Sequence, residues 1–299
     1  TDLISLMQRD LLAPDRVVDI KHVESMQGVR LVDGGLEIGA LTTLEELFDD
    51  PLCAEFASFR DVVDATRSIQ VQAMGTVGGD LCHLPNCWYF RNGDGLLAMD
   101  GRASNVELGD NRYHAIFGNR GPAKFVSASR FAPAMCAAGA HVRVLGPTPG
   151  DEEHLPLDHF FITPKTPNQG VTVLKPGQLI SHIWLPSAAG TKNASYEVME
   201  SEGLDWPLAA AAAHLRMDGS IVRSASICMG HVAPTPWMAP AAAESLVDRP
   251  LNEESAQRAG DIAVADATPL SGNDYKVQLA RTAVKRALLR AVDQLEGGV

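Results

Sequence analysis

The chain has 299 residues, of which 45% are hydrophobic and 21% charged, a composition that is typical of a folded globular protein and excludes a disordered one. Its formal net charge of −12, with no cluster of Lys and Arg, argues against nucleic acid as a partner. No run of about 18 apolar residues is present, so the sequence predicts no membrane insertion.

The first part of the chain predicts short strands and helices. Residues 16–23 and 29–40 alternate β-branched with polar residues, and the second stretch contains Gly-Gly, so we expect a strand and then a hairpin. A helix is expected to follow, capped by Thr42 or Thr43. The glycines of residues 75–82 predict a turn with positive φ angles.

The second part of the chain combines a long irregular stretch with segments of clearer periodicity. Residues 83–125 hold many turn formers and little periodicity, and such long loops usually have a function. Residues 187–193 resemble a linker. The alanine-rich residues 205–217 favour a helix by propensity, but a strand packed against small neighbours also fits. Residues 275–295 show clear helical periodicity.

Two local patterns suggest a ligand. Residues 75–80, with sequence GTVGGD, could expose bare backbone N–H groups to a diphosphate, although a glycine turn that binds nothing explains the same pattern. Asp205 followed by Trp206 places an acid beside a large aromatic ring, which suits a heteroaromatic ligand.

The cysteines and histidines indicate no metal centre. Cys82 and Cys87 lie near His83 and His114, but a structural zinc site usually needs two tight pairs. The five cysteines have scattered spacings, so reduced thiols and a cytoplasmic location are expected, with export to the periplasm on a partner's signal left open.

Five segments together resemble the FAD-binding (medium) subunit of the molybdenum hydroxylase family, of the xanthine dehydrogenase, carbon monoxide dehydrogenase and aldehyde oxidoreductase type. They are residues 1–23, 74–82, 176–186, 230–246 and 271–288. The resemblance implies an α+β fold: a two-lobed FAD-binding domain of the vanillyl-alcohol-oxidase (PCMH) type over residues 1–188, then a smaller α+β domain with an antiparallel sheet over 189–299.

The same resemblance implies FAD as the cofactor of this chain and names its contacts. The first loop and the second glycine motif would hold the diphosphate, Thr66 would be a further contact, Ile180 would face the adenine, and Asp205 and Trp206 would approach the isoalloxazine ring. The residues so assigned are Thr1, Asp2, Leu3, Thr66, Thr76, Val77, Gly78, Gly79, Asp80, Ile180, Asp205 and Trp206. No residue of this chain is expected to be catalytic toward the organic substrate.

Several positions depart from the family pattern. Ala-Gly-Gly usually precedes the residues that match Thr1 to Leu3, so we expect a truncation there. Asp80 stands where Asn is usual, and a carboxylate beside phosphates would weaken binding unless it points away. Glu197 replaces a Lys of some relatives, and a Ser-Asp pair is represented by Ser129 and Arg130.

The insertion over residues 83–125 resembles one that binds a four-iron cluster in the aldehyde oxidoreductase branch. Cys87 matches the first ligand, but no cysteine stands at the other ligand positions. Because such clusters need about four thiolates, we predict that the insertion holds no cluster, and that Cys87 is a ligand only if an unexpected one is present.

The function that follows is electron transfer from iron–sulfur clusters of a partner, through FAD, to an external acceptor. The resemblance implies a large molybdenum-cofactor subunit and a small subunit with 2Fe–2S clusters, in a dimer of heterotrimers. Two alternatives stay open: a structural subunit that no longer binds FAD, and a stand-alone flavin oxidase.

Overall fold

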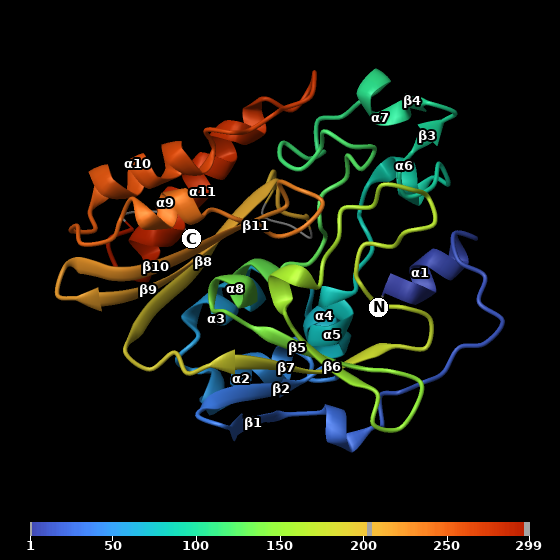
Figure 1. Cartoon of the computed structure of the whole chain (residues 1–299), viewed down its shortest axis with the longest axis horizontal. Helices are drawn as coiled ribbons and strands as arrows, with labels where there is room; N and C mark the ends of the chain where they lie inside the picture. The colour runs from blue at the N-terminus through green and yellow to red at the C-terminus, as the bar shows by residue number, and fades with distance from the viewer. Residues whose placement is uncertain (1, 202–204, 296–299) are drawn as a thin grey trace.

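The computed structural model describes residues 2–201 and 205–295, and two antiparallel sheets organise it (Figure 1). The larger sheet has the strand order β1-β2-β7-β5-β6. Its strands are β1 (Val29–Val32), β2 (Gly35–Gly39), β5 (His141–Leu145), β6 (Glu152–Pro156) and β7 (Leu179–Pro186). The predicted hairpin is confirmed, since β1 and β2 pair through a turn in which Asp33 and Gly34 both have positive φ.

The predicted strand over residues 16–23 is wrong. This segment has no regular structure, and Val17 and Val18 are 54% and 68% exposed. Alternation alone does not make a strand, because the backbone also needs a neighbouring strand to pair with, and none of the described strands lies against this segment.

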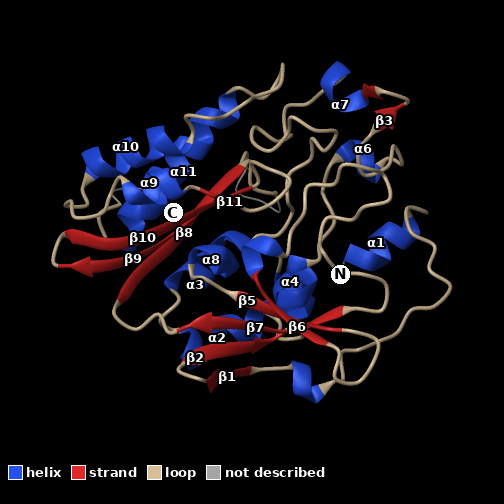
Figure 2. Cartoon of the chain, viewed as in Figure 1, coloured by secondary structure: helices blue, strands red, loops and turns tan. Residues whose placement is uncertain are grey.

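Short helices surround the larger sheet (Figure 2). They are α1 (Asp2–Gln8), α2 (Leu44–Asp49), α3 (Ala57–Ala65), α4 (Ile69–Met74), α5 (Val77–Leu81) and α8 (Ala132–Ala137), with 3-10 turns η1 (Glu24–Met26), η2 (Pro51–Cys53) and η3 (Leu157–His159). The capped helix is confirmed: Thr43 accepts a hydrogen bond from the Glu46 N–H, and the Glu46 carboxylate accepts one from the Thr43 N–H.

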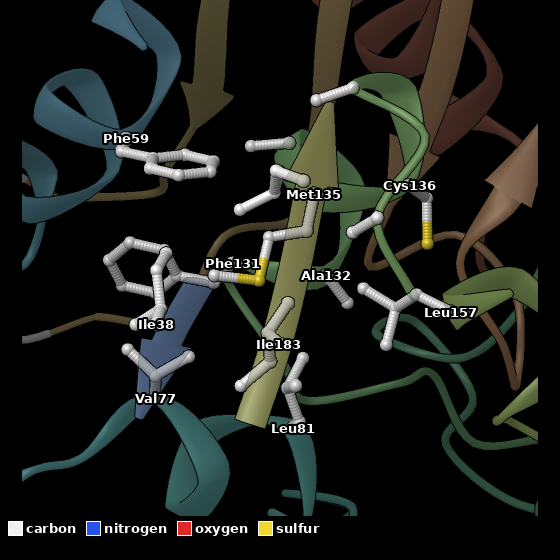
Figure 3. Packing of buried hydrophobic residues seen from close by; sticks show 14 of the residues in the cluster. Ile38, Phe59, Val77, Leu81, Phe131, Ala132, Met135, Cys136, Leu157 and Ile183 are labelled. Atoms are coloured by element: carbon white, nitrogen blue, oxygen red, sulfur yellow. The ribbon is translucent and has the colours of Figure 1, made fainter. Parts of the chain in front are cut away.

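Helix α8 joins the helical layer to the larger sheet. Phe131 and Met135 are fully buried, and Phe131 meets Phe59 of α3 edge to face at 6.1 Å. Figure 3 shows these side chains around the strands that carry Ile38 and Ile183. This core holds the ends of α3, α5 and α8 in fixed positions, and those ends border the site described below.

The smaller sheet has the order β11-β10-β9-β8, and its helices cover one face (Figure 1). Its elements are β8 (Thr191–Val198), β9 (Ala209–Asp218), β10 (Ile221–Gly230), β11 (Trp237–Met238), α9 (Pro240–Glu244), α10 (Glu253–Ala263) and α11 (Tyr275–Ala291). The predicted C-terminal helix is confirmed as α11. Of the two possibilities for the alanine-rich stretch, the strand is the one that forms.

The insertion forms small elements at the edge of the molecule. They are α6 (Trp88–Arg91), β3 (Met99–Asp100), β4 (Ala103–Ser104) and α7 (Asn105–Leu108). Leu97, Ala123, Phe125 and Val171 give this region a small hydrophobic cluster of its own. In the part of the chain that the structure describes, no helix is long and apolar enough to cross a membrane.

Candidate FAD site

Three hollows converge on the indole of Trp206. The Thr76 hollow, of about 990 Å³, is lined by Thr66, Ser68, Thr76, Gly79, Arg130 and Trp206, among others. The Arg91 hollow, of about 820 Å³, includes Asp2, Arg9, His83, Trp88, Arg91 and Trp206. The Cys87 hollow, of about 850 Å³, includes Cys87, Trp88, Tyr113, His114, Trp206 and His231.

The glycine motif forms a helix rather than the predicted turn with positive φ. Thr76 caps α5, its hydroxyl accepting from the Gly79 N–H at 3.1 Å. The Val77 N–H donates to the Thr42 carbonyl at 3.0 Å, and the Gly78 N–H to the Ala40 carbonyl at 2.8 Å. The expectation of bare N–H groups is therefore wrong at these positions, because the adjoining backbone takes up the donors.

The two glycines have different roles. A Cβ on Gly78 would lie 2.9 Å from both Cβ and the carbonyl oxygen of Ala40, so this glycine permits close packing. A Cβ on Gly79 would meet only the Thr76 hydroxyl, at 2.9 Å, and Gly79 is the one that lines the Thr76 hollow. Val77 is fully buried beside Ile38 and faces the core (Figure 3).

Asp80 has its carboxylate engaged by the segment before α8. It accepts hydrogen bonds from the Ser129 hydroxyl and, at 3.1 Å each, from the N–H groups of Arg130 and Phe131. Burial raises the pKa of Asp80, and these three hydrogen bonds oppose the rise. Ser129 therefore binds the Asp80 carboxylate directly. The carboxylate lines the Thr76 hollow, and both of its oxygens already accept hydrogen bonds from the protein.

Glu197 forms a buried ion pair with Arg130. The Arg130 guanidinium donates to both carboxylate oxygens of Glu197 and, at 3.0 Å, to the Ala65 carbonyl at the end of α3. Burial raises the pKa of Glu197, whereas the charge of Arg130 lowers it. Arg130 therefore connects β8 to α3 while also lining the Thr76 hollow.

The other assigned residues are only partly brought together. Thr66 caps α3 and lines the Thr76 hollow, whereas Ile180 is 5% exposed in the sheet core and lines none of the three hollows. Asp2 lies in the Arg91 hollow, and Arg91, at 2.6 Å, lowers the pKa of Asp2 although partial burial acts to raise it. Leu3 is 41% exposed, and Thr1 lies outside the described residues.

Asp205 and Trp206 both line the Thr76 and Cys87 hollows. The Trp206 ring meets the edge of His83, with centroids 4.9 Å apart, and lies 6.4 Å from the ring of His231. Asp205 accepts a hydrogen bond from the Ser201 hydroxyl at 2.6 Å. The pairing of an acid with an aromatic ring thus lies where the hollows meet.

Three site residues were missed by the sequence analysis: His231, Lys276 and Arg130 as a wall of the Thr76 hollow. Lys276 is 1% exposed and donates to the carbonyls of Tyr113 and His114 at 3.1 Å and of His231 at 2.9 Å. No local motif identifies such a lysine. Its only signal is its place within a helical pattern whose buried face it shares.

The two buried imidazoles of the Cys87 hollow stay neutral at pH 7. Burial lowers the pKa of His114 to about 4 and that of His231 to about 3. An unfolded histidine titrates near pH 6.5, so the unfolded state binds more protons between about pH 6.5 and 4, and stability falls as the pH falls.

We therefore expect the urea midpoint to drop between pH 7 and pH 5, and to drop less in His114→Gln. His159→Gln, at an exposed position, is the matched control and should keep the wild-type slope. Equal slopes in His114→Gln and wild type would contradict a neutral buried His114.

Among the residues that the structure describes, His114 is the one metal-binding side chain that pairs with Cys87. Its Sγ lies 3.2 Å from His114 Nε2, and burial raises the pKa of the thiol. Among residues 2–201 and 205–295, no group of three or more His, Cys, Asp and Glu side chains could hold a metal ion.

The Thr76 hollow suits FAD by its donor set. Hydroxyl groups and guanidinium groups line it, the missing side chain of Gly79 leaves room for a ligand beside the backbone, and the Trp206 ring is part of the lining. When bound, FAD would act as an electron carrier that takes up or releases electrons one or two at a time.

Comparisons with known proteins agree with this geometry. Residues 1–188 match the family "FAD binding domain in molybdopterin dehydrogenase", and residues 194–291 match the "CO dehydrogenase flavoprotein C-terminal domain". The chain is 28% identical over 296 residues to the aldehyde oxidoreductase FAD-binding subunit PaoB of Escherichia coli, covering 97% of this chain and 89% of that protein.

A second relative is the carbon monoxide dehydrogenase medium chain of Hydrogenophaga pseudoflava, 25% identical over 291 residues, covering 96% of this chain and 85% of that protein. The solved carbon monoxide dehydrogenase from the same organism superposes with a TM-score of 0.74 at 25% identity, over 98% of this chain and 88% of that one. These matches confirm the α+β fold, with an FAD-binding domain followed by a smaller antiparallel-sheet domain. The chain belongs to the FAD-binding flavoprotein subunits of the molybdenum hydroxylase family, which are oxidoreductases.

Proposed function

We propose that this chain carries electrons through FAD, from the iron–sulfur clusters of a small partner subunit to an external acceptor, within a complex whose large subunit holds the molybdenum cofactor. The observation that carries the proposal is the convergence of three hollows on Trp206. One hollow has the donors for a diphosphate, and the others open from the same indole. An electron donor and an electron acceptor could therefore approach a flavin held there from different hollows.

The residues of this chain have binding and shielding roles in that process. Thr66, Thr76, Gly79 and Arg130 would hold the diphosphate side of FAD, and Trp206 would shield the ring. Asp80 would support this wall through its bonds to the segment before α8, and Asp2 would support the Arg91 hollow through its bonds to Arg91. Leu3 would be a contact at the start of the chain. Ile180 and Val77 would act through the packing of the sheet.

The finer organisation is proposed on the same basis. Residues 1–188 would form the FAD-binding domain and 189–299 the C-terminal domain, which is supported by the two large hydrophobic clusters. The assembly would be a dimer of heterotrimers in the cytoplasm. A structural subunit without FAD is the second candidate, favoured by the internal bonds of the Val77 and Gly78 N–H groups.

The test is the flavin content of the complex purified through a tag on this chain. We expect about one FAD per copy, together with molybdenum and about four irons from two 2Fe–2S clusters. Absence of flavin would establish the structural role, and about four further irons would mean that the insertion does hold a cluster.

Gly79→Leu sharpens this test. A leucine side chain would enter the Thr76 hollow, so FAD per copy should fall at least about tenfold. Its Cβ would also displace the Thr76 hydroxyl that caps α5, which should lower the free energy of unfolding of the FAD-free protein by only about 1 kcal/mol. Gly121→Leu is the matched control, because a Cβ there meets no atom within 4 Å. Unchanged FAD content in Gly79→Leu would exclude this hollow as the diphosphate site.

A further inference from the structure

Helix α8 packs tightly against the smaller sheet as well as into the core of the larger one. All of its residues are buried, and it contacts both β9 and β10. Pro133 marks the point of closest approach, since a Cβ built on Gly230 of β10 would lie 2.6 Å from Cγ of this proline. The helix and the strand therefore meet here with no room for a further side chain.

This contact places Cys136 of α8 over Cys228 of β10. Residues three apart share one face of a helix, so Cys136 projects from the side of α8 that carries Pro133. Residues two apart share one face of a strand, so Cys228 projects from the side of β10 that carries Gly230. One step along each element from the Pro133–Gly230 contact thus leads to a cysteine.

The alternation along β10 agrees with this placement. Cys228 belongs to the same hydrophobic core as Cys136, together with its cross-strand neighbour Ala212. Its chain neighbours Ile227 and Met229 belong instead to the core that holds the buried residues of α11. Cys136 is 6% and Cys228 0% exposed, so the two thiols are enclosed between α8 and the smaller sheet.

The two thiols are in hydrogen-bond contact, and both are free cysteines in this structure. The Cys228 sulfur lies 3.8 Å from the Met229 carbonyl oxygen and donates its S–H to it, which leaves this sulfur able to accept from the Cys136 S–H. The hydrogen bond to Cys228, together with burial, raises the pKa of the Cys136 thiol. Cys136 is therefore protonated and unreactive while α8 stays in place.

We propose that Cys136 and Cys228 form a disulfide bond when hydrogen peroxide oxidises them, and that this bond ties α8 to the smaller sheet. One sulfur attacks the peroxide, breaks its O–O bond and releases one water. The other sulfur then displaces the remaining oxygen as a second water, and the S–S bond forms. The two thiols lose two electrons and two protons, which the peroxide takes up.

The bond would hold the two sheets of the chain together. It would close a loop of about 90 residues that contains strands of both sheets, and closing so long a loop restricts the unfolded chain strongly. Because both sulfurs are enclosed, peroxide reaches them only when α8 moves away from β10. Neither cysteine is among the described lining residues of the three hollows, so the inference does not depend on the electron-transfer function.

The test uses the complex purified through a tag on this chain. It is treated with hydrogen peroxide at several urea concentrations below the unfolding midpoint, then unfolded, alkylated with N-ethylmaleimide and digested without reductant. Mass spectrometry should find the peptides of Cys136 and Cys228 joined, and they should join faster as urea increases. Two alkylated thiols at every urea concentration would overturn the proposal, as would Cys136 joined to Cys53, Cys82 or Cys87 instead.

Thermal unfolding gives a second readout. The joined form should unfold at least about 5 °C above the reduced form, and dithiothreitol should remove this difference. Cys136→Ala and Cys228→Ala should each abolish the shift, measured against their own reduced forms. Cys53→Ala, which removes another buried thiol of the same core, is the matched control and should keep it. A shift of the wild-type size in Cys136→Ala would contradict the disulfide.

Discussion

Arg130→Met should lower the free energy of unfolding by about 3–5 kcal/mol, because it leaves a buried carboxylate without its partner. The Glu197 side chain is 4% exposed, and the only cation paired with it among the described residues is Arg130. Methionine fills similar space but cannot donate to Glu197 or to the Ala65 carbonyl. Urea unfolding at pH 7 measures the loss, and the FAD content should fall with it, since Arg130 lines the Thr76 hollow.

The double variant Arg130→Met/Glu197→Met tests the cause. Removing the stranded carboxylate should recover most of the lost stability, because buried ion pairs are often replaceable by apolar side chains. Arg223→Met is the control: its ion pairs with Asp218 and Asp248 are exposed, and their loss should cost about 0–1 kcal/mol. No recovery in the double variant would mean that Arg130 stabilises the fold through other contacts.

Lys276→Met should lower the free energy of unfolding by about 2–3 kcal/mol, and it should also alter the Cys87 hollow. The carbonyls of Tyr113 and His231 would lose their donor, at about 1–3 kcal/mol each, whereas the His114 carbonyl keeps a bond from Asn273. Relief of the buried charge offsets part of this loss, since burial lowers the pKa of Lys276 to about 7.

Urea unfolding again measures the effect, with Lys285→Met as control because the Lys285–Glu253 pair is partly exposed. Lys276→Gln should be milder than Lys276→Met, because its amide can still donate. A Lys276→Met protein as stable as wild type would show that the three carbonyls do not need the ammonium.

The sequence was sufficient to predict an element wherever the groups that stabilise it lie within one short segment. The hairpin over β1 and β2 follows from Asp33 and Gly34, which both adopt positive φ, and the start of α2 follows from the reciprocal bonds of Thr43 and Glu46. The periodicity of α11 likewise predicts its buried face. In each case the interacting groups are only a few residues apart.

The alanine-rich strand β9 is an element that local sequence did not decide. Helix propensity favours Ala209–Ala213, yet β9 is a central strand between β8 and β10. Ala212 packs into the first core, whereas Ala209, Ala211 and Ala213 pack into the second. A hydrophobic core lies against each face of this strand, so only small side chains fit there. Tertiary packing therefore overrides the helix propensity of alanine.

The sequence alone determined the family, the cofactor class and the elements that are built from local hydrogen bonds and periodicity. The tertiary structure decided how the site is assembled: that the GTVGGD motif begins a helix with its Val77 and Gly78 donors already bound, that Asp80 is held by Ser129, and that Lys276 reaches Tyr113 across more than 160 positions. These contacts join segments that are distant in the chain, and no local pattern encodes them. They depend on which surfaces the two sheets bring together, and a buried polar group finds its partner only after that packing exists.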